Sequence, residues 1–306
     1  IRCCRVCCVV VCSRDSMRYT NMHHLHDYYG QRQAVLVSMH GKATIIEPVL
    51  APQFGLHITA LTTIDTDQFG SFTGEIPRPD TQYQTAVAKA RAGMAHGGYQ
   101  LGIASEGSFF PHPAIPWLTV NHELVVLVDD VHGWVLEGWA TASETTAARQ
   151  QVHTLADVHA FVQRVGFPDQ GIVVRHQRDG VAQVYKDADT VEELCMHVAQ
   201  AQHADTAAVW LETDLRAHRN PKRRLVIRQA AEDLVRNAQR TCVRCSAPGM
   251  RKIATVPGLP CEWCGIPTDQ PKALIYACVR CDYRVELPHD SGQTTAAPEY
   301  CGVCNP

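Results

Sequence analysis

The C-terminal region contains eight cysteines in four CxxC pairs, and no other sequence feature limits the possible folds of this chain as strongly. Two residues between cysteines let one tight turn direct both thiolates at the same tetrahedral metal. Two such turns complete one site, so four pairs predict two Cys4 zinc sites. Such a short region has little apolar core, and the metal would supply most of its folding free energy. The pairs are Cys242 and Cys245, Cys261 and Cys264, Cys278 and Cys281, and Cys301 and Cys304.

The spacing does not decide which pairs share a metal. Successive pairs are separated by 15, 13 and 19 residues, which is typical of zinc ribbons and compatible with sequential, interleaved or nested pairing. Disulfides and iron–sulfur clusters are the competing interpretations. Because the opening segment lacks the features of a secretory signal, we expect a reducing compartment, zinc rather than disulfides, and a cytoplasmic protein.

The first 30 residues differ from the rest of the chain. Five of the first twelve are cysteine, the chain begins with isoleucine, and methionine first occurs at Met17. We expect residues 1–30 to form an N-terminal tail that is either non-native or disordered, and we leave residues 1–21 out of the fold prediction. The alternative is a metal-binding or lipid-modified tail.

Residues 31–215 alternate between short β-branched runs and longer amphipathic stretches. This alternation predicts an α/β domain with a mixed sheet flanked by helices. Asn220 and Pro221 then start a basic connecting helix over residues 216–240, and a zinc-binding domain follows over 241–306. The main expected strands cover 34–38, 56–61, 100–105, 122–129, 134–141, 171–176, 181–185 and 207–213.

Composition excludes two broad classes. With 45% hydrophobic and 19% charged residues, the chain is too apolar to be disordered. No apolar run approaches the ~20 residues that a membrane helix needs, so we expect no membrane partner. The net charge of −3 means that nucleic-acid binding would depend on a local basic patch.

One stretch of sequence offers such a patch. Between Arg216 and Lys252 the chain has eleven lysines or arginines against two acids, Glu232 and Asp233. A basic helix that leads into zinc knuckles is typical of nucleic-acid-binding proteins. The alternative is a solvated helix face that offsets an acidic first domain.

A phosphate site is predicted where the first strand meets the next helix, at the sequence Ser38-Met39-His40-Gly41-Lys42. A glycine beside a lysine at a helix N-terminus offers backbone N–H groups and a positive charge to a phosphate. We expect His40, Gly41 and Lys42 to contact the substrate. The alternative is an ordinary turn with a surface lysine.

Glu106 is the predicted catalytic centre. It ends the strand 100–105, and the preceding helix, which Thr81 is expected to cap, carries Lys89 and Arg91. Ligands gather at the carboxyl ends of strands in α/β sheets, and Mg²⁺ with a polyphosphate needs a carboxylate and nearby cations. The alternative is a loop carboxylate that caps backbone amides. Further expected substrate contacts here are Arg91, Ser105 and Gly107.

A second pair of carboxylates precedes the basic helix. If residues 209–214 form a strand, Glu212 and Asp214 point to the same face, because side chains alternate with period two. Together with Arg216 and His218, they would hold a metal or orient a water. The alternative is an Asp–Arg ion pair beside a helix-capping asparagine.

The loop from Asp65 to Arg78 is rich in glycine and polar residues, and its length predicts a substrate lid. Its polar candidates are Glu75 and Arg78. His112, between two prolines, is a further candidate for contact with a base or a phosphate.

The order of these motifs resembles the inosine triphosphate pyrophosphatase-like superfamily over roughly residues 34–130. A strand, a Gly-Lys turn and a helix are followed by a helix with T-x7-K-A and then by GI-A-S-EG. The resemblance implies a nucleoside triphosphate pyrophosphatase in which Lys42 and Lys89 bind phosphates and Glu106 binds magnesium.

A closer resemblance covers most of the chain from about residue 30. The motifs MHGK, DTDQFGSFTGEIPR, ASEGSFFPHP, ETDLRAHRNP and the terminal CxxC pairs together resemble an uncharacterised bacterial family with a domain of unknown function. This resemblance implies a recurring architecture and no particular reaction.

Together these features predict a Mg²⁺-dependent nucleotide phosphohydrolase with a C-terminal double zinc-knuckle, or zinc-ribbon, region. The alternative is a non-enzymatic zinc-ribbon protein that binds nucleic acid. A third option is a scaffold in which zinc only holds domains or subunits together. The expected catalytic residues are Lys89, Glu106, Glu212 and Asp214.

Overall fold

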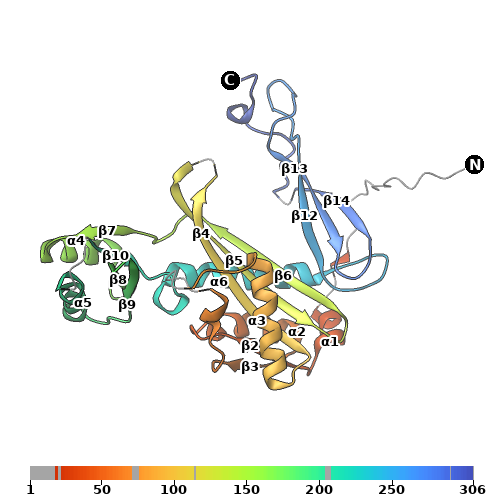
Figure 1. Cartoon of the computed structure of the whole chain (residues 1–306). Coiled ribbons are helices and arrows are strands. Elements are labelled where there is room, and N and C mark those ends of the chain that lie inside the picture. The colour runs from red at the N-terminus through yellow and green to blue at the C-terminus, as the bar shows by residue number, and fades with distance from the viewer. Residues whose placement is uncertain are drawn as a thin grey trace, which may run out of the picture. The chain divides into compact units, whose positions relative to one another are not determined.

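A computed structural model of the chain describes residues 18–19, 22–70, 76–113, 115–203, 208–289 and 291–305. The chain divides into two compact units, whose elements are labelled in Figure 1. The larger unit comprises residues 31–131 and 137–235. The smaller unit combines the described parts of residues 1–30 with residues 132–136 and 236–306.

The larger unit is built on a five-stranded mixed sheet with the strand order β3-β2-β4-β5-β6. β2 lies between two parallel neighbours, β3 and β4, whereas β4 and β5 are antiparallel. The inner strands carry long buried runs of Val, Ile and Leu, as strands covered on both faces require. The strands are β2 (Gln33–Val37), β3 (His57–Leu61), β4 (Leu101–His112), β5 (Ile115–Asp129) and β6 (Trp134–Ala142).

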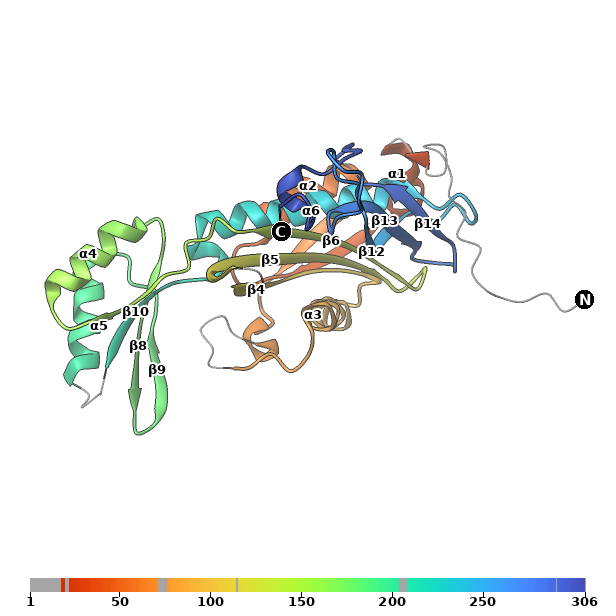
Figure 2. The same ribbon diagram turned by 90° about the horizontal axis from the view of Figure 1, so that it is seen from above.

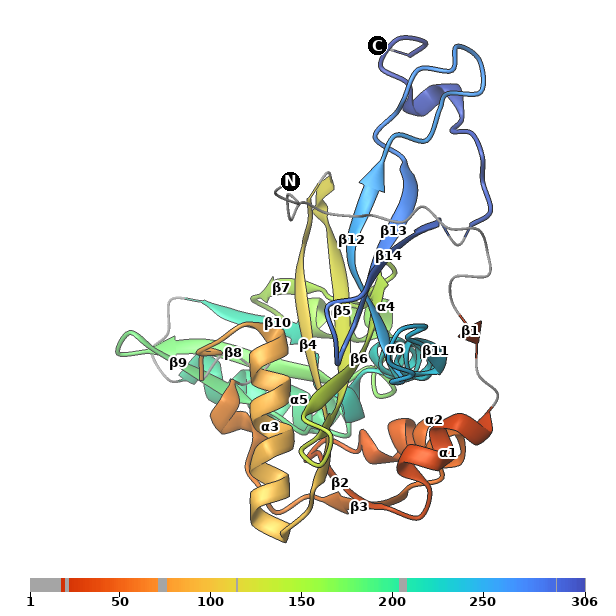
Figure 3. The ribbon, with the colours of Figure 1, turned by 90° about the vertical axis from the view of Figure 1, so that its right-hand side faces the viewer.

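Helices cover both faces of this sheet, with α3 on one face and α2 and the start of α6 on the other (Figures 2 and 3). Thr81 caps α3 in a capping box with Gln84, as predicted. Gly138 of β6 packs directly against α6, because a Cβ there would lie 2.1 Å from the backbone nitrogen of Leu234. The predicted α/β class with a mixed sheet is confirmed. The helices are α2 (Ala43–Phe54), α3 (Gln82–Gly97) and α6 (Pro221–Gln239).

β4 is longer than the sequence predicts. The prediction that this strand ends at Glu106 is wrong, because β4 continues to His112 as the partner of β5. Glu106 therefore lies within a strand, opposite Leu124. The strand ends that matter for the candidate site belong instead to β2 and β3.

A second sheet, antiparallel throughout, follows β6 in the chain with the order β7-β10-β8-β9. It packs against α4 and α5 around a core that includes Phe161, Leu194 and Leu211. Residues 31–215 therefore contain two sheets rather than the single one predicted. The elements are β7 (Arg149–Val152), α4 (Leu155–Val165), β8 (Ile172–Arg178), β9 (Val181–Tyr185), α5 (Val191–His203) and β10 (Val209–Thr213).

The basic helix α6 begins where the sequence predicts. The side-chain oxygen of Asn220 accepts a hydrogen bond from the backbone N–H of Arg223 at 2.9 Å, and Pro221 occupies the first helical position. In the described ranges no helix, α6 included, combines the length and apolar character needed to cross a membrane.

The smaller unit contains a three-stranded antiparallel sheet with the order β12-β13-β14. In β12 the pairing with β13 runs from Met250 opposite Cys278 to Pro257 opposite Pro271. These strands are β12 (Met250–Pro257), β13 (Pro271–Cys278) and β14 (Arg284–Pro288).

The N-terminal residues differ from the predicted tail. Helix α1 (Met22–Tyr29) buries Tyr29 completely, and the Tyr29 hydroxyl accepts a hydrogen bond from Trp134 Nε1 at 2.8 Å. Strand β1 (Arg18–Tyr19) pairs with β11 (Arg240–Thr241). The larger unit begins at Gln31, directly after the predicted tail, and the last segment of the smaller unit begins at Arg236 rather than after residue 240. Residues 1–17, 20 and 21 lie outside the described residues.

Candidate functional site

The eight C-terminal cysteines form two clusters of four thiols. In each cluster the four sulfur atoms lie within 4.8 Å of one another, and the shortest separations are 3.6–3.9 Å. Four sulfurs bound tetrahedrally at ~2.3 Å from one zinc ion lie about 3.8 Å apart, whereas a disulfide bond is about 2.05 Å long. Both clusters therefore fit zinc. They are Cys242, Cys245, Cys278 and Cys281, and Cys261, Cys264, Cys301 and Cys304.

The first CxxC pair shares a cluster with the third, and the second pair shares one with the fourth. The reason is the antiparallel sheet, which places the two clusters at its opposite ends. Met250 at the start of β12 lies opposite Cys278 at the end of β13, which brings the first and third pairs together. Pro257 lies opposite Pro271 at the other end of the sheet, where β14 also ends. The second and fourth pairs meet there. The eight residues of β12 separate these ends by about 27 Å at 3.4 Å per residue.

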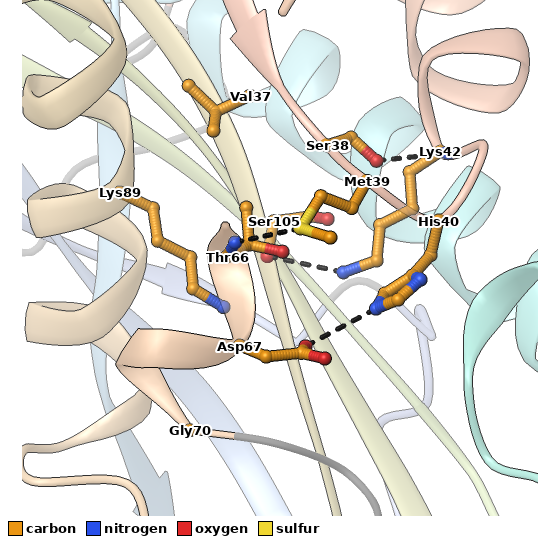
Figure 4. Close-up of a pocket in the computed structure, with 10 residues that line it drawn as sticks. All are labelled: Val37, Ser38, Met39, His40, Lys42, Thr66, Asp67, Gly70, Lys89 and Ser105. Carbon is orange, nitrogen blue, oxygen red and sulfur yellow. Dashed lines mark hydrogen bonds and ion pairs between the residues drawn. The ribbon is translucent and has the colours of Figure 1, made fainter. Parts of the chain in front are cut away.

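A cavity in the larger unit lies at the carboxyl ends of β2 and β3 (Figure 4). Its walls come from the loop after β2, the 3₁₀ helix η2 (Thr66–Phe69) after β3, α3 and β4. From β2 the chain passes through α2 to β3 on one side, and then through α3 to β4 on the other side of β2. Ligands in α/β sheets bind where the chain connections diverge in this way. The lining residues are Val37, Ser38, Met39, His40, Lys42, Thr66, Asp67, Gly70, Lys89 and Ser105.

Lys42 is a buried cation in the wall of this cavity. Its ammonium group donates a hydrogen bond to the carbonyl oxygen of Ser105 at 3.3 Å, and among the described residues no carboxylate pairs with it. Burial, followed by the nearby charge of Arg223, lowers the pKa of Lys42 to about 7. A buried ammonium without a carboxylate partner is unfavourable, and an anionic ligand would supply the missing charge.

Glu106 is held by two cations beside the cavity. Lys89 Nζ donates to Oε2 at 2.6 Å, and Arg78 Nη2 donates to Oε1 at 2.7 Å. Burial acts to raise the pKa of this carboxyl group, but Lys89, Lys42 and Arg78 outweigh it and the net shift is downward. Glu106 is therefore ionised at neutral pH and offsets only part of the surrounding positive charge.

This arrangement does not fit the magnesium ion that the sequence predicts on Glu106. Both carboxylate oxygens already accept hydrogen bonds from cations, and these positive charges repel a divalent cation that approaches the same oxygens. Elsewhere in the described part of the chain, only the cysteine clusters gather three or more His, Cys, Asp or Glu ligands. The charge of the cavity suits an anion better than a divalent cation.

His40 lies in the same wall as Lys42. Its Nε2 atom is 3.4 Å from Asp67 Oδ1, and its ring stacks on His218 with centroids 5.1 Å apart and an interplanar angle of 17°. Burial lowers the pKa of His40 below its usual value, although Asp67 opposes this shift. Burial and then the charge of Arg216 lower the pKa of His218. Both rings are therefore mainly neutral at neutral pH.

The structure brings together part of the predicted site. His40, Lys42, Lys89 and Ser105 line the cavity, and Gly41, with a φ of 66°, makes the turn between the first two. Arg78 adjoins the cavity through Glu106, and its guanidinium also donates to the carbonyl oxygen of Gly107. Glu75, predicted in the lid, lies outside the described residues.

Two predicted contacts lie elsewhere. Arg91 is two positions beyond Lys89, on another side of α3, and pairs with Asp130 at 3.2 Å. His112 is six residues beyond Glu106 in β4, roughly 20 Å along an extended strand. Neither side chain lines the cavity.

The predicted pair of carboxylates does not share a strand face. β10 ends at Thr213, so Asp214 lies beyond the strand. Glu212 remains on the second sheet, where its two oxygens pair with Arg149 and Arg175 at 3.0 Å each. Its carboxylate is occupied by these arginines and is not part of the cavity.

Asp214 belongs to an ion-pair network before α6. Its carboxylate is 1% exposed and pairs with Arg216 at 2.7 Å, and Arg216 also pairs with Asp187 at 2.7 Å. His218 lies 3.9 Å from Asp187. Of these residues, His218 approaches the cavity most directly, through its stacking on His40.

Sequence reasoning missed a buried ion pair beside the cavity. Arg223 pairs with Glu123 at 2.7 Å, and both side chains are fully buried. A Cβ at Gly107 would touch both of them, which places the pair next to Glu106. The charge pattern of α6 marks Arg223 only as one of many basic residues, so no sequence signal distinguishes it.

The basic residues between 216 and 252 do not all contribute to one accessible patch. Arg223 is buried, and several others pair with carboxylates within their own unit. These pairs are Arg216 with Asp214 and Asp187, Arg219 with Asp189, Arg228 with Glu232, and Arg244 with Asp282.

Comparison with known proteins identifies a family without assigning a reaction. A search of curated proteins found no match. The sequence of the chain matches a family described as a domain of unknown function (DUF6671) over residues 89–306, which include Lys89, Glu106 and all eight clustered cysteines. This match covers most of the chain and confirms the predicted resemblance to an uncharacterised family. The chain therefore belongs to the DUF6671 family.

Proposed function

We propose that the cavity binds the phosphate groups of a nucleotide and that the protein hydrolyses a phosphoanhydride bond of this substrate. The observation that carries the proposal is the burial of the Lys42 ammonium without a carboxylate partner. Its ammonium is buried in the cavity wall, bonded to one carbonyl oxygen and paired with no carboxylate of the described residues. A phosphate oxygen in the cavity would complete its hydrogen bonds and its charge balance.

The surrounding charges support an anionic ligand. Figure 4 shows Lys42 and Lys89 on different walls, with both side chains directed toward the space between them. Lys89 and Arg78 share a single carboxylate, Glu106. The Arg223–Glu123 pair adds no net charge, and Asp67 also lines the cavity, so the region holds three cations against two anions when Lys42 is protonated. Developing negative charge on a transferred phosphoryl group would be stabilised here.

The choice of a nucleotide rests on the sequence. The succession of a Gly-Lys turn, a helix with T-x7-K-A and the turn around Glu106 resembles the inosine triphosphate pyrophosphatase-like superfamily. We place the phosphates against Lys42 and Lys89 and assign Glu106 the role of positioning Lys89 and Arg78. Magnesium enters this proposal only as an ion carried by the nucleotide phosphates.

The test is turnover of a panel of standard and deaminated nucleoside triphosphates with Mg²⁺, measured as release of phosphate and pyrophosphate. We expect turnover by the wild-type protein and loss of at least about 100-fold in kcat/KM for Lys42→Met, because a cation that clamps the transferring phosphate is removed. Lys222→Met, at an exposed lysine on α6, is the matched control and should retain activity. Both variants should keep their zinc content.

Two results would contradict the proposal. One is the absence of turnover by zinc-loaded wild-type protein on every nucleotide of the panel. The other is unchanged activity in Lys42→Met, which would show that the reaction takes place away from this cavity.

A further inference from the structure

The hairpin formed by β4 and β5 carries a surface that the proposed function does not use. The last pair between β2 and β4 joins Leu36 to Ile103, whereas β4 and β5 continue together beyond this point as a two-stranded hairpin (Figure 1). From Gly107 to His122 the sequence contains no Asp, Glu, Lys or Arg. A partly exposed segment of this length without any charge is unusual, because charged side chains are mostly found on protein surfaces.

The exposed residues of this segment are all apolar. Trp117 is 87% exposed, Phe110 is 38% exposed and Ile115 is 36% exposed. Exposed apolar side chains that cluster on a surface mark a contact with another molecule. In the described part of residues 107–122, the exposed residues are Phe110, Pro111, Pro113, Ile115, Pro116 and Trp117. We call these six residues the hairpin tip.

The backbone of the hairpin tip suits packing through side chains rather than the addition of a strand. Pro111 lies in β4 and has no N–H group. A proline within a sheet turns its nitrogen toward an open edge, where it deprives a further strand of one ladder hydrogen bond. Proline also fixes φ, so three prolines between residues 111 and 116 limit the entropy that the tip loses when it is bound.

The absence of charge decides which partner fits the hairpin tip. The phosphates of a nucleic acid are bound by lysines and arginines, and a membrane surface is bound through basic residues together with apolar ones. The segment from Gly107 to His122 contains no such cation. A matching protein surface is itself apolar and uncharged, and the same tip on a second copy of the chain has this composition. Two-fold contacts between identical patches are the commonest in protein oligomers.

We propose that the hairpin tip is a dimer contact, in which the tips of two copies pack against each other around a two-fold axis. Trp117 of each copy covers the tip of the other, and Phe110 and Ile115 border the contact. Three large apolar side chains per copy make less than the ~1,600 Å² of a standard interface, so the dimer is weak, with a micromolar Kd. None of the tip residues lines the cavity, and the contact is therefore independent of the proposed function.

The test is sedimentation velocity of the zinc-loaded, full-length protein at concentrations from about 1 to 200 µM, which bracket a micromolar Kd. We expect the wild type to pass from monomer to dimer across this series. Trp117→Ser should weaken dimerisation at least about tenfold, because aromatic anchors carry most of the binding energy of a contact. Trp263→Ser is the matched control, because it removes a tryptophan that is 74% exposed but lies beside Glu262. It should dimerise like the wild type.

Two further measurements test the character of the contact. Trp117→Lys and Trp117→Glu should each be monomeric, because like charges would meet across the two-fold axis. An equimolar mixture of the two should recover the dimer, since opposite charges then meet. Raising the salt concentration from about 0.05 to 0.5 M should not weaken the wild-type dimer, because the contact contains no charged residue. If Trp117→Ser does not fold, as judged by circular dichroism, Ile115→Ser takes its place and should also weaken the dimer.

Four results would overturn the proposal. A wild type that stays monomeric over the whole series is the first, and flotation of this monomer with phosphatidylcholine vesicles would assign the tip to a membrane instead. A dimer that is unchanged in Trp117→Ser would place the contact elsewhere on the molecule. A mixture of Trp117→Lys and Trp117→Glu that remains monomeric would show that the two tips do not meet. A wild-type dimer that weakens with salt would show that charged surfaces make the contact.

Discussion

Arg223 and Glu123, 100 residues apart in the chain, form an ion pair in which neither side chain is exposed. Arg223 Nε donates to Glu123 Oε1 at 2.7 Å and Nη2 donates to Oε2 at 3.3 Å. A third hydrogen bond joins Nη1 to the carbonyl oxygen of Leu215 at 2.6 Å. The pair joins α6 to β5 beside the cavity. Arg223 lowers the pKa of Lys42, whereas Glu123 raises it.

Breaking this pair should destabilise the larger unit strongly. Arg223→Met leaves a buried, uncompensated carboxylate, and we expect a loss of about 3–5 kcal/mol in the free energy of unfolding. Arg228→Ala, in the exposed pair with Glu232, is the control and should lose roughly 0–1 kcal/mol. Denaturant unfolding of both variants measures the difference, and equal losses would contradict this account.

The double substitution Arg223→Met with Glu123→Leu should be less destabilising than the sum of the two single substitutions. The reason is that no unpaired charge remains buried when both partners are apolar. A double-mutant cycle measured by denaturant unfolding gives the coupling. Additive losses would mean that the two residues act independently.

Gly107→Ala tests the close packing behind Glu106. A Cβ at this position would lie 2.3 Å from Glu123 Oε1 and 2.5 Å from Arg223 Nη2, so the buried pair must move. We expect a loss of roughly 1–3 kcal/mol, typical of overpacking. Gly302→Ala, where a Cβ meets open space, should leave the melting temperature unchanged. Wild-type stability in Gly107→Ala would contradict the placement of the pair.

Ligand affinity should depend on the protonation of Lys42. Its pKa of about 7 means that the ammonium form, which binds an anion, is complete below pH 7 and is lost as the pH rises through this value. Affinity for pyrophosphate should then fall up to about tenfold for each further pH unit. The ratio of wild-type to Lys42→Arg affinity removes the ionisation of the ligand itself. A ratio that does not change between pH 6 and 9 would contradict the assignment.

The two cysteine clusters should release zinc at different rates. Cys264 is exposed in the cluster that it forms with Cys261, Cys301 and Cys304, whereas the other cluster has no exposed cysteine. We expect two zinc ions per chain and biphasic release to a chelator, with the faster phase lost in Cys264→Ser. Cys245→Ser is the matched variant in the other cluster and should remove the slower phase. Zinc content measured by mass spectrometry checks the stoichiometry, and a single phase would contradict the difference.

Much of the fold follows from short-range patterns in the sequence. The cap at Thr81 and the start of α6 at Asn220 depend on local hydrogen bonds, and the sequence predicts both. The end of β4 was harder to predict, because the strand continues through Pro111 only as a partner of β5. Tertiary pairing overrides local turn chemistry there.

The candidate site was predictable where one turn supplies several groups. The Gly-Lys turn contains His40 and Lys42 within three residues, and both line the cavity. The pairing of the Glu106 carboxylate with Arg78 was not predictable, because Arg78 lies in a loop 28 residues away in the chain. The strand pairing that makes the two cysteine clusters interleaved also depends on long-range register, which CxxC spacing does not encode.

The most direct test of the central claim is the binding of pyrophosphate to zinc-loaded wild-type protein and to Lys42→Met by isothermal titration calorimetry at pH 6.5. The account predicts stoichiometric binding to the wild type and at least tenfold weaker binding to Lys42→Met, with Lys222→Met unchanged. Equal affinity of the wild type and Lys42→Met, or no binding to the wild type, would contradict the claim that this cavity binds phosphate through Lys42.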